Sequence, residues 1–235
     1  MEILHSNKNL LNNLNSVKDV TPYRNQQRQC QQQNRTQVCQ KEQQNQNNSK
    51  NVVSISKRPE VLSPPKVINY TKENYNNINL NFQFSIHRPG KFLNRDLKLI
   101  FPNIGEEVLS NLKILPIFFK ASVDLVAVNE RSNLERNFFL EEILAIAAKL
   151  KKVLNNYFLD LTDPASGYPV YSDRGCSLYP DVDGSVRLLK YDCIQAGCCR
   201  VIVHPQWGTK NYPCSIFTDA PVDVIFNIFD NFHQL

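Results

Sequence analysis

The sequence has few of the residues that the common nucleotide-binding and hydrolase motifs require. Only seven of its 235 residues are glycine. None of them stands in the GxGxxG or GxxxxGK[ST] spacing with which a backbone loop cradles phosphates. No Gly-x-Ser-x-Gly string occurs either, so the sequence gives no motif for a nucleotide-dependent enzyme or a serine hydrolase.

Long apolar runs and paired cysteines are also missing. No run approaches the roughly eighteen residues that a membrane span needs, so no membrane partner is expected. The seven cysteines contain no Cys-x-x-Cys pair and lack the usual spacing of zinc ligands. An odd number of cysteines without a secretory signal indicates a reducing compartment and mostly reduced thiols.

The net charge of +5 belongs to the N-terminal quarter of the chain. Residues 1–60 carry nine Lys or Arg against four acids, and residues 61–235 carry 18 against 18. The remainder of the chain therefore gives no charge argument for binding nucleic acid. The basic segment could contact nucleic acid weakly, but a solvated spacer explains its charge equally well.

Residues 1–60 predict a disordered, Asn- and Gln-rich tail. Asn and Gln occupy 16 of the 26 positions in 25–50, which leaves too little apolar surface to offset the entropy of ordering. A faint helical stripe in 1–20 makes this segment a candidate mitochondrial leader, although Glu2 and Asp19 count against it. We expect a linker over 61–76 and a folded domain over 77–235.

Hydrophobic periodicity divides the folded domain into alternating strands and helices. The predicted strands are 78–86, 112–119, 123–128 as the antiparallel partner of the preceding one, 158–161, 186–193, 198–204 and 212–218. The predicted helices are 91–101, 133–157 and 221–232, and an irregular loop runs from about 162 to 184. Pro116 has no N–H, which predicts an edge strand or a bulge there. This order is typical of an α+β domain with a largely antiparallel sheet flanked by helices.

The chemistry-bearing residues gather in the strand 198–204, CCRVIVH. Because side chains alternate along a strand, Cys199 shares a face with two valines and is expected in the core. Cys198 then faces solvent or a ligand, with Arg200 roughly 6.6 Å along the same face, close enough to favour a thiolate. A charged His204 would add to this effect. The alternative is that Cys198 is an inert thiol that packs as a small hydrophobe.

Three strings in this region resemble one known family. DPASG (163–167), GCCRVIVHPQWGT (197–209) and SIFTDAP (215–221) are similar, in order and spacing, to the CblD family of cobalamin-trafficking adaptors, the methylmalonic aciduria and homocystinuria type D family. The resemblance is closest over 157–221 and extends more loosely to Ile78, with FPNI (101–104) at a matching helix end.

The resemblance implies a nitroreductase-like fold without flavin and a protein that is not an enzyme. Such an adaptor binds a CblC-type cobalamin-processing protein as a heterodimer and directs cobalamin to cytosolic methionine synthase and mitochondrial methylmalonyl-CoA mutase. By the same resemblance, Cys198 supplies a thiolate to the cobalt of cobalamin in the complex. Met1 is the only methionine, so a shorter cytosolic form from an internal start is not expected, and a cytoplasmic and mitochondrial location would depend on one leader. The alternative function is a thiol- or flavin-dependent oxidoreductase on the same fold.

Overall fold

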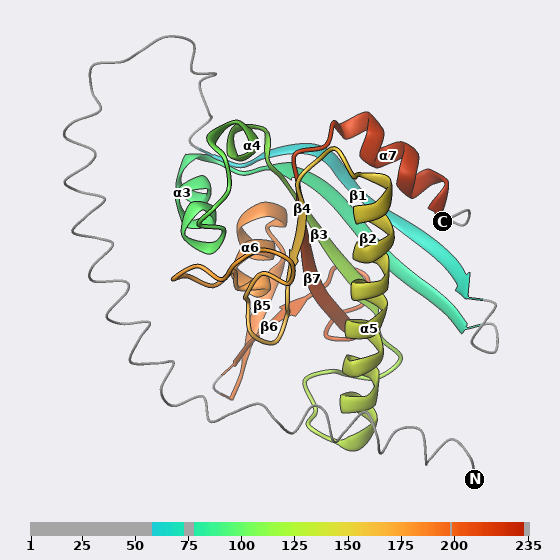
Figure 1. Cartoon of the computed structure of the whole chain (residues 1–235). Coiled ribbons are helices and arrows are strands. Elements are labelled where there is room, and N and C mark those ends of the chain that lie inside the picture. Colours follow the sequence, from blue (N-terminus) through green and yellow to red (C-terminus); the bar gives the residue numbers. More distant parts are fainter. Residues whose placement is uncertain (1–57, 73–77, 198, 233–235) are drawn as a thin grey trace. The chain divides into compact units, whose positions relative to one another are not determined.

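A five-stranded antiparallel sheet forms the centre of the folded domain. The computed structural model describes residues 58–72, 78–197 and 199–232, so the predictions for the tail before residue 58 lie outside the described residues. The strand order in the sheet is β1-β2-β3-β7-β4 (Figure 1). Its strands are β1 (Glu60–Lys72), β2 (Ile78–Arg88), β3 (Lys113–Lys120), β4 (Leu159–Thr162) and β7 (Asn211–Thr218).

Helices cover both faces of this sheet. The helices α5 (Glu130–Val153) and α7 (Val222–Asp230) pack on one face, where the phenylalanines of β2 and β3 fill a large apolar core. The helices α3 (Lys91–Ile100), α4 (Glu106–Asn111) and α6 (Asp181–Leu189) lie on the other face, over a second core around Phe217 and Ile114 (Figure 1). The predicted α+β class, with an antiparallel sheet flanked by helices, is confirmed.

The long helix α5 begins directly after its N-cap residue, Asn129. Asn129 accepts the backbone N–H of Ser132 at 2.9 Å, and the Ser132 hydroxyl accepts the N–H of Asn129 at 3.1 Å. This reciprocal capping box starts α5 three residues before the predicted boundary. Phe92 on α3 and Leu134 on α5 are exposed, although both are apolar.

Several predicted elements differ from the structure. The expected linker contains most of β1, which pairs along its length with β2. Residues 123–128 form no strand, and β3 pairs instead with β2 and β7. The predicted strand 186–193 is wrong, because α6 runs to Leu189 and the next strand starts at Asp192.

Pro116 lies in a central strand, not at an edge. The pairing of β3 with β7 runs without interruption and includes Pro116 opposite Ser215. The register with β2 stops after Ile117, which pairs with Phe84, and resumes at Ile114, which pairs with His87. The missing N–H is thus accommodated by a local gap in one ladder.

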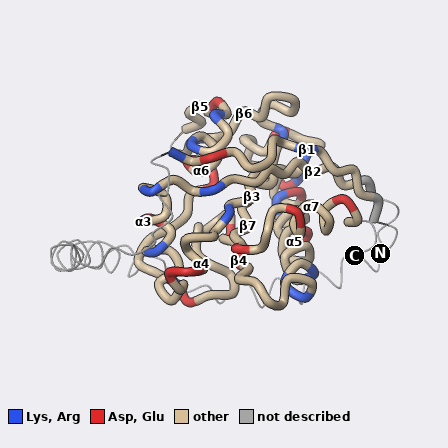
Figure 2. The backbone as a smooth tube through the Cα atoms, turned by 90° about the horizontal axis from the view of Figure 1, so that it is seen from above, with Lys and Arg blue, Asp and Glu red and all other residues tan. Residues whose placement is uncertain are grey.

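Charges of both signs are spread over the described part of the domain. Segments of Lys and Arg and segments of Asp and Glu are both distributed along the backbone (Figure 2), in keeping with the neutral sum over residues 61–235. Within the described ranges, no helix is both long enough and apolar enough to cross a membrane.

Candidate functional site

A two-stranded hairpin, separate from the main sheet, carries the cysteine-rich string. The strand β5 (Asp192–Ala196) pairs antiparallel with β6 (Cys199–Val203), and Ala196 faces Cys199 at the end of the ladder. Gly197 follows with φ of +60°, a conformation that glycine adopts without strain. Both Gly197 and Cys199 are exposed. Cys198 lies outside the described residues, so its outward orientation stays a prediction.

The predicted assignment of faces to β6 is wrong. Cys199 was expected in the core, but it is exposed, and Val201 and Val203 are only half-buried. The buried face carries Ile202 and, directly after the strand, His204, each 1% exposed. Alternation holds, yet both faces of CRVIVH contain branched residues. The strand β6 contacts α6 and β7, and these contacts determine which of its two faces is buried. The residue pattern within β6 gives no information about these contacts.

Arg200 connects the hairpin to α6. Its guanidinium donates to the sulfur of Cys193 at 2.8 Å across the hairpin and forms an ion pair with Asp183. The hydrogen bond to Cys193 and the charge of that sulfur, followed by the charge of Asp183, raise the pKa of Arg200 above its ordinary value. These described contacts give Arg200 a thiol partner that sequence reasoning missed, and its predicted effect on Cys198 stays a prediction.

His204 anchors the base of the hairpin. Its ring stacks on Trp207 with centroids 4.1 Å apart and planes inclined by 12°, and it also contacts the rings of Phe118 and Tyr191. The Nδ1 atom accepts the backbone N–H groups of Gln206 and Trp207 at 3.2 and 3.3 Å. Burial lowers the pKa of His204 to about 4. The imidazole is therefore neutral at pH 7 and cannot act as the charged neighbour of a thiolate that we predicted.

The rest of the HPQWGT segment closes the hairpin onto the sheet. His204 and Gly208 exchange two backbone hydrogen bonds of 2.8 Å, and Gly208 has φ of +57°. The Asn211 amide donates to the carbonyl groups of Ile202 at 3.0 Å and Gly208 at 2.6 Å. This string therefore fixes where the hairpin leaves the sheet.

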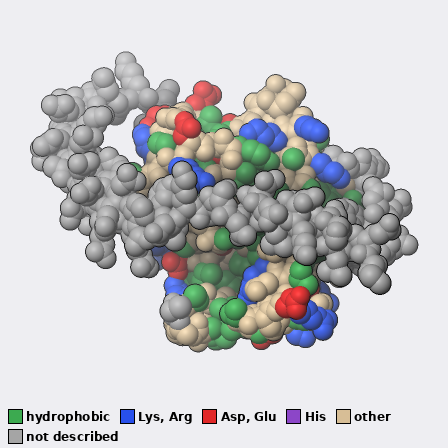
Figure 3. Space-filling model, turned by 60° about the horizontal axis from the view of Figure 1, so that its bottom comes forward, with side chains coloured by type: hydrophobic (Ala, Val, Ile, Leu, Met, Phe, Trp, Pro, Cys, Tyr) green, Lys and Arg blue, Asp and Glu red, His purple; other side chains and the backbone are tan. Residues whose placement is uncertain are grey.

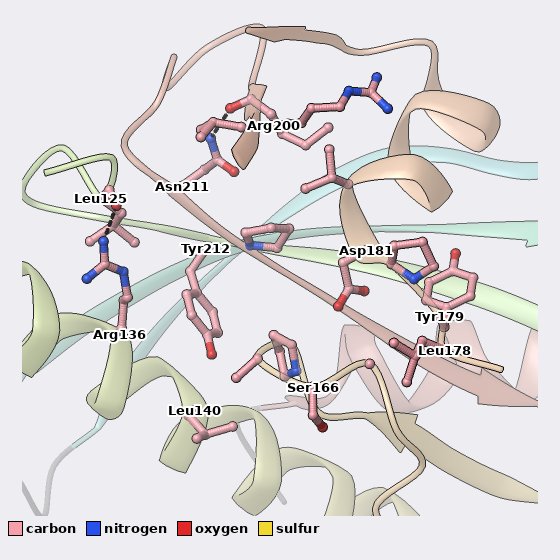
Figure 4. Close-up of a pocket in the computed structure, with 18 of the residues that line it drawn as sticks. Leu125, Arg136, Leu140, Ser166, Leu178, Tyr179, Asp181, Arg200, Asn211 and Tyr212 are labelled. Carbon is pink, nitrogen blue, oxygen red and sulfur yellow. Dashed lines mark hydrogen bonds between the residues drawn. The ribbon is translucent and has the colours of Figure 1, made fainter. Parts of the chain in front are cut away.

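A cavity of about 580 Å³ lies beside the hairpin (Figure 4). Its walls come from the turn at 164–167, the strand residues 200–202, the segment 178–182, the start of β7, three residues of α5, Leu125 and Thr209. Two of the three strings that resemble the CblD family thus line it directly. The third begins at Ser215, whose hydroxyl donates to the wall residue Asp181 at 2.6 Å.

Two aspartates, the buried Asp160 and the half-buried Asp163, organise the loop between β4 and α6, and sequence reasoning assigned this role to neither. Asp160, which is completely buried, accepts the backbone N–H groups of Leu161, Val170, Tyr171 and Ser172. The Asp163 carboxylate accepts the hydroxyl of Ser166 at 2.6 Å and closes the DPASG turn. The residues around Asp160 do not predict that it orders this loop. Most of the N–H groups that it accepts belong to the main chain ten to twelve residues further on.

The surface around the hairpin combines apolar and charged side chains. Ile194 on β5 is 46% exposed, and Val170, Tyr171 and Leu178 in the preceding loop are also exposed. On the face shown in Figure 3, hydrophobic side chains lie between charged residues of both signs. In the described part of the chain, no group of three or more His, Cys, Asp or Glu is placed to hold a metal ion.

The fold and the site define a class of protein: an α+β domain that holds a cysteine-bearing hairpin on an aromatic anchor, beside a cavity. The model of the methylmalonic aciduria and homocystinuria type D protein family matches residues 6–227. The chain belongs to this family. The match begins at residue 6, far earlier than the motifs in the sequence suggested.

Curated relatives with the same name support this assignment. The chain is 31% identical over 135 residues to the mouse cobalamin trafficking protein CblD, in a match that covers 57% of this chain and 45% of the relative. The human protein of that name is 30% identical and the chicken protein 27% identical over the same length. The matched region spans less than half the length of these relatives.

Proposed function

We propose that this protein is a non-enzymatic adaptor in intracellular cobalamin metabolism. It binds a CblC-type processing protein that carries cobalamin, and it directs the cofactor towards methionine synthase and methylmalonyl-CoA mutase. Membership of the family and the names of the curated relatives support this role. The proposal includes a nitroreductase-like ancestry of the fold without flavin, for which the helices on both faces of the antiparallel sheet are the supporting feature.

The proposed working group is the thiolate of Cys198, offered to the cobalt of cobalamin held by the partner. Thiolate is a soft donor and suits a late first-row metal. The observation that carries this assignment is the hairpin itself, in which both chain neighbours of Cys198 are exposed while His204 and Trp207 hold its base. A thiol at such a place can reach a metal on another protein without a deep pocket of its own.

Arg200 is the proposed source of positive charge near this thiolate. An adjacent guanidinium lowers the free energy of the deprotonated sulfur, which is the form that binds metal. Its contact with Cys193 at 2.8 Å shows that it already approaches one sulfur of the hairpin. The pair with Asp183 holds the guanidinium beside the hairpin.

The absorbance spectrum of cobalamin tests this function when the protein and the CblC-type partner are mixed with it. Coordination by sulfur should change the spectrum of the ternary mixture, and Cys198→Ser should abolish that change. Cys199→Ser is the matched control, because it alters the adjacent and exposed thiol. A spectral change that survives Cys198→Ser, or that disappears with Cys199→Ser, would contradict the assignment of the sulfur.

A thiol- or flavin-dependent oxidoreductase is the second candidate. The hydrogen bond from Arg200 to Cys193 favours it, because a cysteine beside a guanidinium is a common setting for a reactive thiol. This function requires either yellow protein on purification or turnover that depends on a thiol. Colourless, inactive protein that still forms the complex with the partner would remove it.

We propose a cytoplasmic and mitochondrial location, with residues 1–60 acting as the leader for the second compartment. The low acid content of this segment supports the idea, with four acids against nine basic residues. A reporter fused to residues 1–60 should enter mitochondria in part, and a reporter that stays wholly outside would exclude this role.

A further inference from the structure

The cavity beside the hairpin has the size and lining of a small-molecule site. Its volume of about 580 Å³ lies within the range of roughly 300–1,000 Å³ that such sites occupy. Most of its wall is apolar, and the apolar side chains come from the loop before α5, from α5 itself, from the start of α6 and the segment before it, from the hairpin and from β7. They include Leu125, Leu140, Leu178, Val182, Val201 and Pro213.

One acidic side chain in this wall lacks a partner for half of its carboxyl group. Asp181 is 6% exposed, and its Oδ1 atom accepts the hydroxyl of Ser215 at 2.6 Å. Its Oδ2 atom is buried and has no hydrogen-bond partner among the described residues. A buried acceptor without a donor is unfavourable, so a donor that reached this carboxyl group would be bound favourably. Figure 4 shows Asp181 across the cavity from Tyr212 and above Ser166.

Two arginines line the same cavity, but protein groups already occupy both guanidinium groups. Arg136 donates to the Asn133 side chain at 2.6 Å and to the Ala127 carbonyl at 3.0 Å, and it also bonds the carbonyl of Leu125. Arg200 bonds Cys193 and pairs with Asp183. The cavity therefore offers a ligand the acidic acceptor Asp181, beside the buried hydroxyl of Tyr179, which also has no partner among the described residues. An anionic ligand would find no uncommitted arginine.

We propose that this cavity binds a small organic cation, with an apolar body against the aliphatic wall and a protonated nitrogen directed at the carboxyl group of Asp181, which lines the cavity. The apolar wall excludes a bare, strongly hydrated ion, because such an ion would lose water without gaining ligands. The carboxylate selects the charge, and the volume admits a body of about one or two rings. This site goes beyond the proposed adaptor function and is independent of Cys198.

Ionisation of Asp181 gives the proposal a second signature. Burial raises the pKa of Asp181 to about 7, the hydrogen bond from Ser215 opposes this shift, and the charge of Asp163 adds to it. The other titratable groups that face this carboxyl are Tyr179, Tyr212 and Cys214, and burial raises the pKa of each of them. They are neutral at pH 7, so Asp181 is the group that titrates in this range.

Calorimetry on the full chain with three ring compounds of equal shape tests the site. Benzamidine carries the cation, benzamide is its neutral analogue and benzoate its anionic analogue. We expect benzamidine to bind at least tenfold more tightly than benzamide, and benzoate not to bind. Because only the ionised carboxylate attracts the cation, and its fraction rises from about 0.1 at pH 6 to about 0.9 at pH 8, benzamidine affinity should rise about tenfold over this interval.

Three variants separate the site from general effects of charge or folding. Asp181→Asn keeps the shape of the side chain and should abolish the preference for benzamidine over benzamide. Asp173→Asn makes the same change at an exposed residue and should leave binding as in the parent. Ala165→Trp fills the mouth of the cavity from an exposed position and should block binding while Asp181 stays intact. Equal binding of benzamidine and benzamide, or benzamidine binding that survives both Asp181→Asn and Ala165→Trp, would overturn the proposal.

Discussion

Acid should destabilise this protein through His204. Its imidazole is 1% exposed, and burial lowers its pKa from 6.5 to about 4. A base whose pKa is depressed in the folded state binds more protons when the chain unfolds, so stability is present above pH 6.5 and is lost as the pH falls towards 4. From these two pKa values, the free energy of unfolding should fall by about 2 kcal/mol between pH 7 and pH 5 on account of this residue alone.

The substitution His204→Asn isolates this contribution. The asparagine carbonyl can accept the N–H groups of Gln206 and Trp207 that now bond Nδ1, but it does not titrate. We expect a loss of about 2 kcal/mol at pH 7 from the lost stack on Trp207 and the space left behind. The further loss between pH 7 and pH 5 should be smaller than in the parent by about 2 kcal/mol.

Urea unfolding at both pH values measures these differences. His87 is equally buried, and burial lowers its pKa to about 4 as well, so His87→Asn should reduce the acid sensitivity by a similar amount. The two reductions should add, because additivity holds for sites without shared partners. If His204→Asn lost as much stability between pH 7 and pH 5 as the parent, the assignment of a buried, neutral imidazole would be refuted.

Two glycines give further tests by thermal or urea unfolding. A Cβ atom at Gly175 would lie 1.9 Å from the carbonyl oxygen of Leu99, so Gly175→Ala should lower the free energy of unfolding by about 3 kcal/mol. Gly105→Ala is the control, because a Cβ atom there meets nothing within 4 Å. It should change the free energy of unfolding by less than about 0.5 kcal/mol. A Cβ atom at Gly184 would lie 2.1 Å from the Tyr179 hydroxyl, so Gly184→Ala should cost about 2 kcal/mol, and about 1 kcal/mol less when combined with Tyr179→Phe. Equal costs in both Tyr179 backgrounds would show that the contact does not exist.

The strongly periodic elements were predictable from the sequence, whereas the partners of the strands were not. The alternation in β2 and the stripe of α5 depend on neighbours within a few residues, and both elements occur, although their ends differ from the predicted ones. The position of β3 between β2 and β7 depends on a pairing with residues about a hundred positions later. The hydrogen bonds of its uninterrupted ladder with β7 compensate for the one backbone donor that Pro116 lacks. This compensation depends on a distant strand, so the residues around Pro116 do not predict it.

The helix α6 shows a different limit. Its sequence, DVDGSVRLL, contains a glycine and branched residues, which favour an extended reading. Gly184 is nevertheless required inside the helix because the ring of Tyr179 fills the space where a side chain would lie. Tertiary packing therefore decided this element, and the same packing buried Asp181 at its first position. Sequence patterns gave no reason to single out that carboxyl.

The family resemblance and the alternation of side chains along the strand both pointed to Cys198, for different reasons. The structure contradicts the second reason and leaves the first as it was. The expected burial of Cys199 was wrong, so the contrast between an inner and an outer thiol no longer supports Cys198. The remaining support is the anchoring of the hairpin, in which the residues of the HPQWGT segment hold the strands while the end of the hairpin faces outward. Most of the recognised string therefore serves to position a short exposed segment. Such an arrangement suits a group that must meet a second protein more than one that must enclose a substrate.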